Sequence, residues 1–297
     1  MKEKFAGRLK RKGLLLLDCA MGTALQKAGL KSGVECGELW NADSNRDKVL
    51  QLHRSCVEAG SDIIITNTFG ANPIKLAHYG ASERTEELNR EGARLAVEAA
   101  GSEVLVAGDI GPTGDILQEW GGTRSREEIQ DAYERQVSGL LEGGVDLIIM
   151  ETFMDIEELL LAFEAARKLS SGLPVIASMT FEAGPSGMRT LWGLTPQQAA
   201  QKLEAAGLDS VGANCGMGIR NMLEVAAEMV KATSLPVAVQ PNAGIPEVCG
   251  GETFFPETAE HMAETAGEFK AAGVKIIGGC CGTTPEYIAA LKRRLGL

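Results

Sequence analysis

Three cysteines have the residue type and placement that suit metal chemistry. Cys215 ends the segment GANC at 212–215, and Cys280 and Cys281 end the segment GGCC at 278–281. Both segments close apolar stretches that read as buried strands, so the thiols can meet at one end of a parallel sheet. Three thiolates suit Zn²⁺, and a tetrahedral ion with three protein ligands keeps one position open, as catalytic zinc sites do. The sequence therefore predicts one catalytic zinc ion per chain, held by these three residues.

Three thiolate ligands favour one kind of reaction. Hydrolytic zinc sites have histidine or carboxylate ligands that leave the ion electrophilic, whereas three thiolates make the complex electron-rich. A substrate thiol that binds at the open position loses its proton and remains a strong nucleophile. Alkyl transfer to a thiol is therefore predicted. A zinc hydrolase is disfavoured also because the three histidines, His53, His78 and His261, fall in predicted helices or adjoining loops.

Two other interpretations of the cysteines stay open. Adjacent cysteines such as Cys280 and Cys281 can form a strained disulfide, which would suit a non-catalytic redox sensor or a simple metal-binding barrel. Each cysteine could also be a buried small side chain, although a vicinal pair with a third cysteine on a matching strand end favours the metal. Measured zinc content distinguishes these interpretations.

Eight short apolar segments would position these cysteines. Each is too short for a helix and too continuously apolar for a half-exposed strand, which is typical of parallel strands buried on both faces. Amphipathic segments lie between them. The predicted strands cover 14–20, 62–69, 104–110, 147–153, 175–181, 210–215, 237–242 and 275–280.

Recurring residue patterns mark the predicted helix ends. Glycine closes a helix before four of the strands, in EAGSD at 58–62, EGGVD at 142–146, AAGLD at 205–209 and AAGVK at 271–275. A capping box with proline at the first helical position is predicted for Thr195, Pro196 and Gln198. A second cap followed by proline is predicted for Thr284 and Pro285.

This alternation predicts an α/β protein, a single (β/α)₈ TIM barrel over residues 1–297, rather than a doubly wound open sheet. The longer loops follow the first, third, fifth and seventh strands, at the C-terminal face where such barrels hold their chemistry. The cysteines close the sixth and eighth strands, which contribute to the same interior layer. Glycines at 278, 279 and 282 would let the backbone turn so that both adjacent cysteines reach one ion.

Composition excludes several classes of protein. The 297 residues are 44% hydrophobic and 23% charged with a mean hydropathy of -0.01, as in a globular protein with a large core. The net charge of -11, without a Lys/Arg stripe, argues against nucleic acid as a partner. The apolar run at 14–17 is too short for a signal peptide, and none approaches the roughly 20 residues of a membrane span, so we expect a cytoplasmic protein. Seven cysteines, an odd number without paired spacings, do not indicate a disulfide framework.

Five segments resemble those of the homocysteine S-methyltransferase family, and they span essentially the whole chain in order. The pair formed by the last two is the most specific, and the resemblance is strongest to the homocysteine-binding domains of the cobalamin-dependent methionine synthase branch. It implies a zinc-bearing barrel in which the sulfur of homocysteine takes the fourth zinc position and is methylated to methionine. The segments are DCAMGT at 18–23, TNTFGAN at 66–72, GDIGPTG at 108–114, GANC at 212–215 and GGCCGTTP at 278–285.

The same resemblance implies the residues that bind homocysteine. Asp18 and Glu151 would bind its amino group, and backbone N–H groups around Ala20 and Met21 would bind its carboxylate. Both acids end predicted strands on the C-terminal face, where an ammonium ion could pair with them, although a salt bridge or a helix cap is the alternative role. Asn67 could add a hydrogen bond or cap a loop.

One residue departs from the pattern of the family. Cys19 stands where the family usually has glycine. A positive φ at this position would strain a cysteine. A thiol there could also fill the open zinc position in the resting enzyme.

The methyl donor is a separate question. The betaine-using branch has tyrosines where this chain has Gly70 and Thr152, and aromatic cages hold quaternary ammonium groups, so betaine is disfavoured. We expect a methylcorrinoid (methylcobalamin) protein on a separate chain as donor, with S-methylmethionine as the alternative. Loop aromatics could line the mouth of the site or anchor the loops; they are Trp40, Trp120, Trp192, Phe254 and Phe255.

Overall fold

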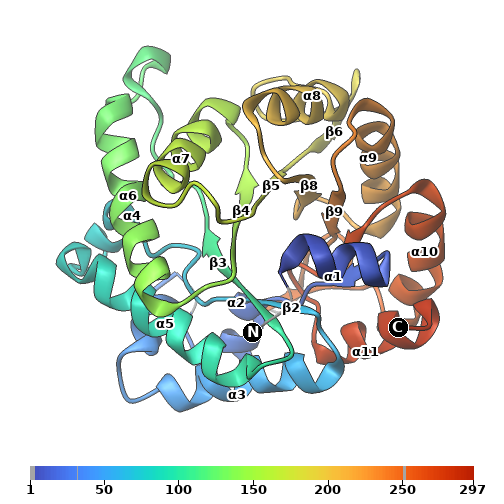
Figure 1. Cartoon of the computed structure of the whole chain (residues 1–297), viewed down its shortest axis with the longest axis horizontal. Helices are drawn as coiled ribbons and strands as arrows, with labels where there is room; N and C mark the ends of the chain where they lie inside the picture. Colours follow the sequence, from blue (N-terminus) through green and yellow to red (C-terminus); the bar gives the residue numbers. More distant parts are fainter. Residues whose placement is uncertain (1–3, 32, 250–251) are drawn as a thin grey trace.

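The computed structural model describes residues 4–31, 33–249 and 252–297, and it describes only the backbone of Cys249 and Glu252. Eight parallel strands form one sheet in the order β1-β12-β9-β8-β5-β4-β3-β2, which curls into a nearly closed barrel (Figure 1). This arrangement confirms the predicted (β/α)₈ barrel. The barrel strands are β1 (Leu15–Leu16), β2 (Ile63–Ile65), β3 (Leu105–Ile110), β4 (Leu147–Phe153), β5 (Val175–Met179), β8 (Ser210–Asn214), β9 (Val237–Gln240) and β12 (Ile276–Ile277).

Helices between the strands surround the barrel (Figure 1). The outer helices are α3 (Arg46–Ala59), α5 (Thr85–Ala100), α6 (Arg126–Gly143), α7 (Ile156–Leu169), α8 (Pro196–Ala206), α9 (Ile219–Ala232), α10 (Ala259–Ala272) and α11 (Pro285–Leu295). Smaller elements occupy the loops after the strands. They are α2 (Met21–Lys27), η1 (Gly37–Asn41), α4 (Pro73–Ala77), η2 (Ser82–Arg84), η3 (Gln118–Trp120), the hairpin of β6 (Glu182–Gly184) with β7 (Gly187–Arg189), and the hairpin of β10 (Glu247–Cys249) with β11 (Glu252–Phe254). Positions 250–251 of the predicted loop after the seventh barrel strand lie outside the described residues.

Two aspartates bridge the contact between β1 and β2, which we call the seam. The N–H of Asp62 donates to the carbonyl of Leu16 (2.7 Å), and the N–H of Leu16 donates to the Asp62 carboxylate (3.0 Å). At the other end of the seam, the N–H of Ile65 donates to the Asp18 carboxylate (2.8 Å). Side chains therefore take the place of ladder hydrogen bonds where two short strands meet.

A helix that the sequence patterns did not predict, α1 (Phe5–Lys12), lies across the N-terminal end of the barrel (Figure 1). Phe5 is buried with interior strand residues such as Leu15 and Ile63. The ammonium of Lys12 pairs with the Asp62 carboxylate at 2.5 Å. The helix thus covers the end of the barrel that is opposite the cysteines.

The structure confirms most of the predicted helix ends. Gly60, Gly144, Gly207 and Gly273 all cap helices with left-handed φ values of 105, 89, 90 and 102°. The box at Thr195 has both of its hydrogen bonds.

The cap predicted at Thr284 is only partly correct. Helix α11 does begin at Pro285, but the Thr284 side chain makes no capping bond to the backbone. Its hydroxyl instead donates to the Glu286 carboxylate. The Thr284 hydroxyl therefore bonds to a carboxylate in the first turn of the helix instead of capping a backbone N–H group.

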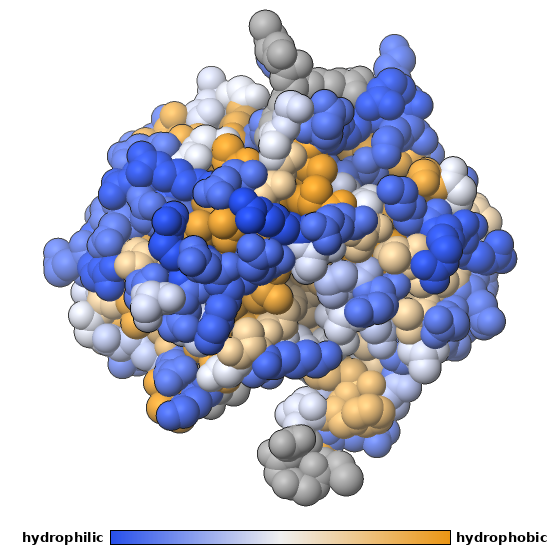
Figure 2. Space-filling view, turned by 90° about the horizontal axis from the view of Figure 1, so that it is seen from below, coloured by the Kyte–Doolittle hydropathy of each residue, from blue (hydrophilic) through white to orange (hydrophobic). Residues whose placement is uncertain are grey.

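The surface is mostly hydrophilic, with apolar residues in separate patches, on the face that Figure 2 presents. Among the described residues, no helix combines the length and the apolar character needed to cross a bilayer. The apolar residues instead gather in the barrel interior and between the strands and the outer helices.

Candidate functional site

The three predicted cysteines meet at the C-terminal end of the barrel. Cys215 directly follows β8, and its Sγ lies 4.0 Å from the Sγ of Cys281. The Sγ atoms of Cys280 and Cys281 are also 4.0 Å apart, and all three sulfurs lie within 4.8 Å of one another. A tetrahedral zinc ion with Zn–S bonds of about 2.3 Å separates its sulfurs by about 3.8 Å. The sulfurs therefore fit a shared zinc ion, and no described histidine or carboxylate belongs to the cluster.

Unusual backbone geometry brings the three thiols together. Cys215 has a left-handed φ of 59°, which is uncommon for any residue except glycine and was not predicted. Gly282 has a φ of 82°, as expected for a turning point. Gly278 and Gly279 serve a different purpose, since a Cβ on Gly279 would lie 2.4 Å from the Thr283 hydroxyl. These glycines therefore permit close approach of neighbouring segments rather than a positive φ.

The cluster readily carries negative charge. Hydrogen bonds from Cys280 and Cys281 lower the pKa of Cys215 to about 3. The same contact raises the pKa of Cys281 to about 12, so the three sulfurs share one thiolate charge. A divalent cation would displace the remaining thiol protons, because metal ligands must be deprotonated.

A cavity of about 440 Å³ joins this cluster to the predicted substrate residues. It lies at the C-terminal end of the barrel, where the loops after the strands surround it. The sequence-predicted residues that line it are Asp18, Ala20, Met21, Asn67, Glu151, Cys215, Cys280 and Cys281. One cavity therefore brings together residues that are up to 263 positions apart (281 minus 18).

The two acids expected to bind an ammonium group line this cavity, where Asp18 is buried and Glu151 is partly buried. Burial raises the pKa of Asp18 well above its usual range, although its carboxylate also accepts the N–H of Ile65. Burial and the charge of Cys215 raise the pKa of Glu151 to about 7. The Oε2 atom of Glu151 is buried and has no partner among the described residues. A cationic group in the cavity would supply the missing partner.

The other predicted substrate contacts are partly occupied by the protein. The N–H of Ala20, the residue before α2, donates to the Thr283 hydroxyl (3.2 Å). The amide nitrogen of Asn67 donates to the carbonyl of Gly37 (2.9 Å) and to the Oδ1 of Asn41 (2.9 Å). Asn67 thus ties η1 to the end of β2, which supports its loop-anchoring alternative.

The structure corrects both expectations for Cys19. Thr152 and Cys215 are the non-glycine residues with positive φ in the described part of the chain, so Cys19 is not strained in this way. Its Sγ does not belong to the metal cluster but lies 3.2 Å from the Sγ of Cys56, on α3. The Cys56 contact raises the pKa of Cys19, because a proton shared between two buried sulfurs is held tightly.

Sequence reasoning missed some residues of the cavity. Asp109 lines it with a buried Oδ1 that has no partner among the described residues, and the GDIGPTG motif was the available signal. Phe69 also lines the cavity, whereas none of the five loop aromatics does. Trp40 packs in the core, and the rings of Trp120 and Trp192 are 5.8 Å apart on the surface.

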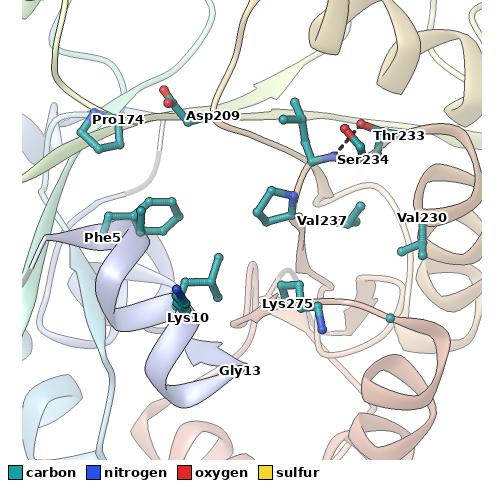
Figure 3. A pocket seen from close by; sticks show the side chains of 15 residues that line it. Phe5, Lys10, Gly13, Pro174, Asp209, Val230, Thr233, Ser234, Val237 and Lys275 are labelled. Atoms are coloured by element: carbon teal, nitrogen blue, oxygen red, sulfur yellow. Dashed lines mark hydrogen bonds between the residues drawn. The ribbon is translucent and has the colours of Figure 1, made fainter.

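A second cavity, of about 660 Å³, lies at the opposite end of the barrel (Figure 3). The lining combines Phe5 and Lys10 of α1 with Pro174, which precedes β5, and with Val237, the first residue of β9. No cysteine or unpartnered carboxylate is among the described residues that line it. Of these two cavities, the C-terminal one holds the cysteine cluster and the unpartnered carboxylate oxygens.

Comparison with known proteins agrees with this geometry. The sequence profile of one family, homocysteine S-methyltransferase, matches residues 15–295. The methionine synthase of Mycobacterium tuberculosis is 35% identical over 287 residues, and that of Mycobacterium leprae is 33% identical. Each match covers 91% of this chain but only 24% and 23% of the relatives, so the chain spans about a quarter of their length.

Solved structures give the same result over the full length. The metallated form of the homocysteine methyltransferase MmuM from Escherichia coli superposes with a TM-score of 0.78 at 26% identity, covering 97% of this chain and 98% of that one. A carboxyl transferase domain of Rhizobium etli pyruvate carboxylase, at 13% identity and a TM-score of 0.56, shares the fold alone. The chain belongs to the homocysteine S-methyltransferase family.

Proposed function

We propose that this chain is an enzyme that transfers a methyl group to the thiol of homocysteine and forms methionine, with one Zn²⁺ held by Cys215, Cys280 and Cys281. The observation that carries the proposal is the single cavity in which three sulfurs within 4.8 Å of one another lie beside buried carboxylates. The family assignment supports the same reaction.

Each group of the cavity has a proposed role. When bound, zinc supplies the substrate sulfur as a thiolate at neutral pH, where a free thiol with a pKa of about 8.5 is mostly protonated. Asp18 and Glu151 bind the amino group of homocysteine, since an ammonium ion satisfies the unpartnered Oε2 of Glu151. The backbone N–H groups of Ala20 and Met21 bind its carboxylate, and the Ala20 N–H exchanges the Thr283 hydroxyl for that carboxylate. These contacts orient the thiol toward the three cysteines.

The methyl donor is proposed to be a methylcorrinoid (methylcobalamin) protein on a separate chain, which would make that protein a partner. The resemblance to the methionine synthase branch supports this donor. S-methylmethionine is the alternative small donor. Location in the cytoplasm stays a prediction.

The test is a metal and activity comparison of purified variants. We expect about one zinc per chain by elemental analysis in the wild type and loss of both zinc and methionine formation in Cys215→Ala. Cys36→Ala is the matched control, because Cys36 is a buried cysteine that does not line the cavity and does not belong to the cluster of three sulfurs, so this variant should keep its zinc. A metal-free wild type that forms a reversible Cys280–Cys281 disulfide would instead support the redox sensor.

The donor is tested separately with the wild type. We expect methionine formation from homocysteine and methylcobalamin. Turnover with S-methylmethionine in the absence of any corrinoid would refute the corrinoid part of the proposal and leave the acceptor unchanged.

A further inference from the structure

Strand β4 contains one extra residue where it reaches the cavity. In its pairing with β5, Met150 lies opposite Ala177 and Phe153 lies opposite Met179, so three steps along β4 match two along β5. This is the signature of a β-bulge, which bends a strand and redirects its side chains. Bulges of this kind are common beside active sites.

The alternation of side chains identifies the extra residue. Leu147 and Ile149 pack inside the barrel, whereas Met150 packs in the outer core between strands and helices. Continued alternation places Glu151 on the inside, where it lines the cavity. On this alternation Thr152, which also lines the cavity, is the inserted residue, and it directly follows Glu151.

Thr152 is held in an unfavourable conformation. Its φ of 64° is left-handed, which is strained for a β-branched residue and persists only when its surroundings stabilise it. The Asn214 side chain makes two hydrogen bonds to it. Oδ1 accepts the Thr152 N–H at 2.8 Å, and Nδ2 donates to the Thr152 hydroxyl at 2.7 Å.

Asn214 reaches Thr152 from a strand that is not its neighbour. It ends β8, which is separated from β4 by β5 in the sheet, and it is fully buried. Its Nδ2 also lies 3.8 Å from the Sγ of Cys280, and the next residue in the chain is Cys215. One amide therefore contacts both the cysteine cluster and the bulge that carries Glu151.

We propose that Asn214 is a positioning residue that holds the bulge at Thr152 and thereby aims the Glu151 carboxylate at the amino group of homocysteine. The inference rests on the proposed function, because it assigns Asn214 to recognition of that substrate. Asn214 acts through Glu151. The effect of Asn214 on ligand affinity therefore requires both the amino group of the ligand and the carboxylate of Glu151.

The experiment measures ligand binding to the zinc-loaded protein by calorimetry. Two thiols are compared: homocysteine, and 4-mercaptobutyrate, which lacks the amino group. We expect Asn214→Ala to weaken homocysteine binding about ten-fold, the scale of one lost hydrogen bond to a charged group, and to leave 4-mercaptobutyrate binding unchanged. In a Glu151→Gln background, Asn214→Ala should have no further effect on homocysteine, since the group it positions is gone.

Two controls separate positioning from general damage to the fold. Asn89→Ala removes an equally buried asparagine on α5, outside the cavity, and should leave the affinity for both thiols unchanged. Replacing Thr152 by glycine, which adopts a positive φ without strain, should reduce the loss caused by Asn214→Ala. This double variant also provides a measurement if the single variant folds poorly.

The outcomes distinguish the inference from the proposed function. Equal weakening of both thiols, loss of zinc in Asn214→Ala, or additive effects of Asn214→Ala and Glu151→Gln would overturn the inference alone. A zinc-loaded wild type that does not bind homocysteine would overturn the proposed function, and the role of Asn214 would fall with it.

Discussion

At the scale of single residues, buried polar atoms without partners mark two different situations. In the cavity, the free oxygens of Glu151 and Asp109 face a space that a ligand can fill. His53 on α3 is different, because both of its ring nitrogens are buried and neither has a partner among the described residues. An orphaned polar group contributes to binding in the first case and reduces stability in the second.

His53 predicts a specific pH dependence of stability. Burial lowers its pKa in the folded state from 6.5 to about 4. Above pH 6.5 the ring is neutral in both the folded and the unfolded state, so it causes no loss of stability. As the pH falls from 6.5 to 4, the unfolded chain binds a proton that the folded protein does not bind, and the folded state becomes less stable. At pH 4.5 this costs about 2.5 kcal/mol of unfolding free energy.

Urea denaturation at pH 7 and at pH 4.5 checks this prediction. Between pH 7 and pH 4.5, the unfolding free energy of His53→Leu should fall by about 2.5 kcal/mol less than that of the wild type. It should be at least as stable at pH 7, because two unpartnered nitrogens are removed. The exposed His78 provides the control, and His78→Leu should follow the wild type. An equal acid loss in His53→Leu and the wild type would contradict the prediction.

At the scale of elements, helix ends determine where strands begin, and helix starts determine where the loops at the C-terminal face end. Glycines in the left-handed conformation end five helices directly before strands, namely α1, α3, α6, α8 and α10, so the chain enters the barrel in a defined direction. The two threonine–proline starts differ, since the Thr195 hydroxyl accepts the N–H of Gln198 (3.1 Å) and the Thr284 hydroxyl makes no such bond. Two helix starts with the same Thr-Pro pattern can thus contribute different amounts to the unfolding free energy.

The two threonines form a matched pair of substitutions. Thr195→Ala removes a side chain that satisfies a free N–H of the first turn and should lower the unfolding free energy by about 1 kcal/mol. Thr284→Ala removes no backbone cap and should cost less than half as much. Urea denaturation of both variants measures the difference, and equal losses would argue against the assignment of the caps.

At the scale of the whole molecule, the residues of the candidate site and the helix that closes the barrel lie at opposite ends of the barrel. The cysteines, the carboxylates and the longer loops lie at the C-terminal end, whereas α1 closes the N-terminal end with apolar contacts. The Asp62 carboxylate accepts a backbone hydrogen bond at the end of the seam that α1 covers. The Asp18 carboxylate accepts one at the end that reaches the cavity. Changes at one end should therefore leave the other end largely intact.

Phe5 tests this separation. Its side chain is 4% exposed in the interior cluster, so Phe5→Ala should lower the unfolding free energy by about 3 to 5 kcal/mol. The folded fraction should bind zinc and homocysteine as the wild type does, because α1 lies opposite the cavity. Leu169→Ala, at a position that is 42% exposed, is the control and should cost far less. Weaker homocysteine binding by folded Phe5→Ala would show that the two ends are coupled.

The sequence by itself determined the local features of this protein. Apolar runs located all eight barrel strands because burial on both faces requires continuous hydrophobicity, and glycines located helix ends because left-handed caps require them. The placement of Cys215, Cys280 and Cys281 also followed, since strand ends of a parallel barrel share one face. Strand lengths were less predictable: 62–69 was expected where β2 covers Ile63–Ile65, because the polar residues that follow turn into the cavity.

The tertiary structure alone decided the features that depend on distant residues. The bulge at Thr152 depends on Asn214, a partner 62 positions away, and no local pattern encodes that contact. The left-handed backbone of Cys215 was not evident from the sequence either, and the Cys215 N–H donates to the carbonyl of Gln240 on a neighbouring strand. The same is true of Cys19, whose neighbour Cys56 lies 37 positions along the chain. Local propensity specifies which elements form, but the orientation of a side chain at the site depends on which elements meet, and that is settled only when the barrel closes.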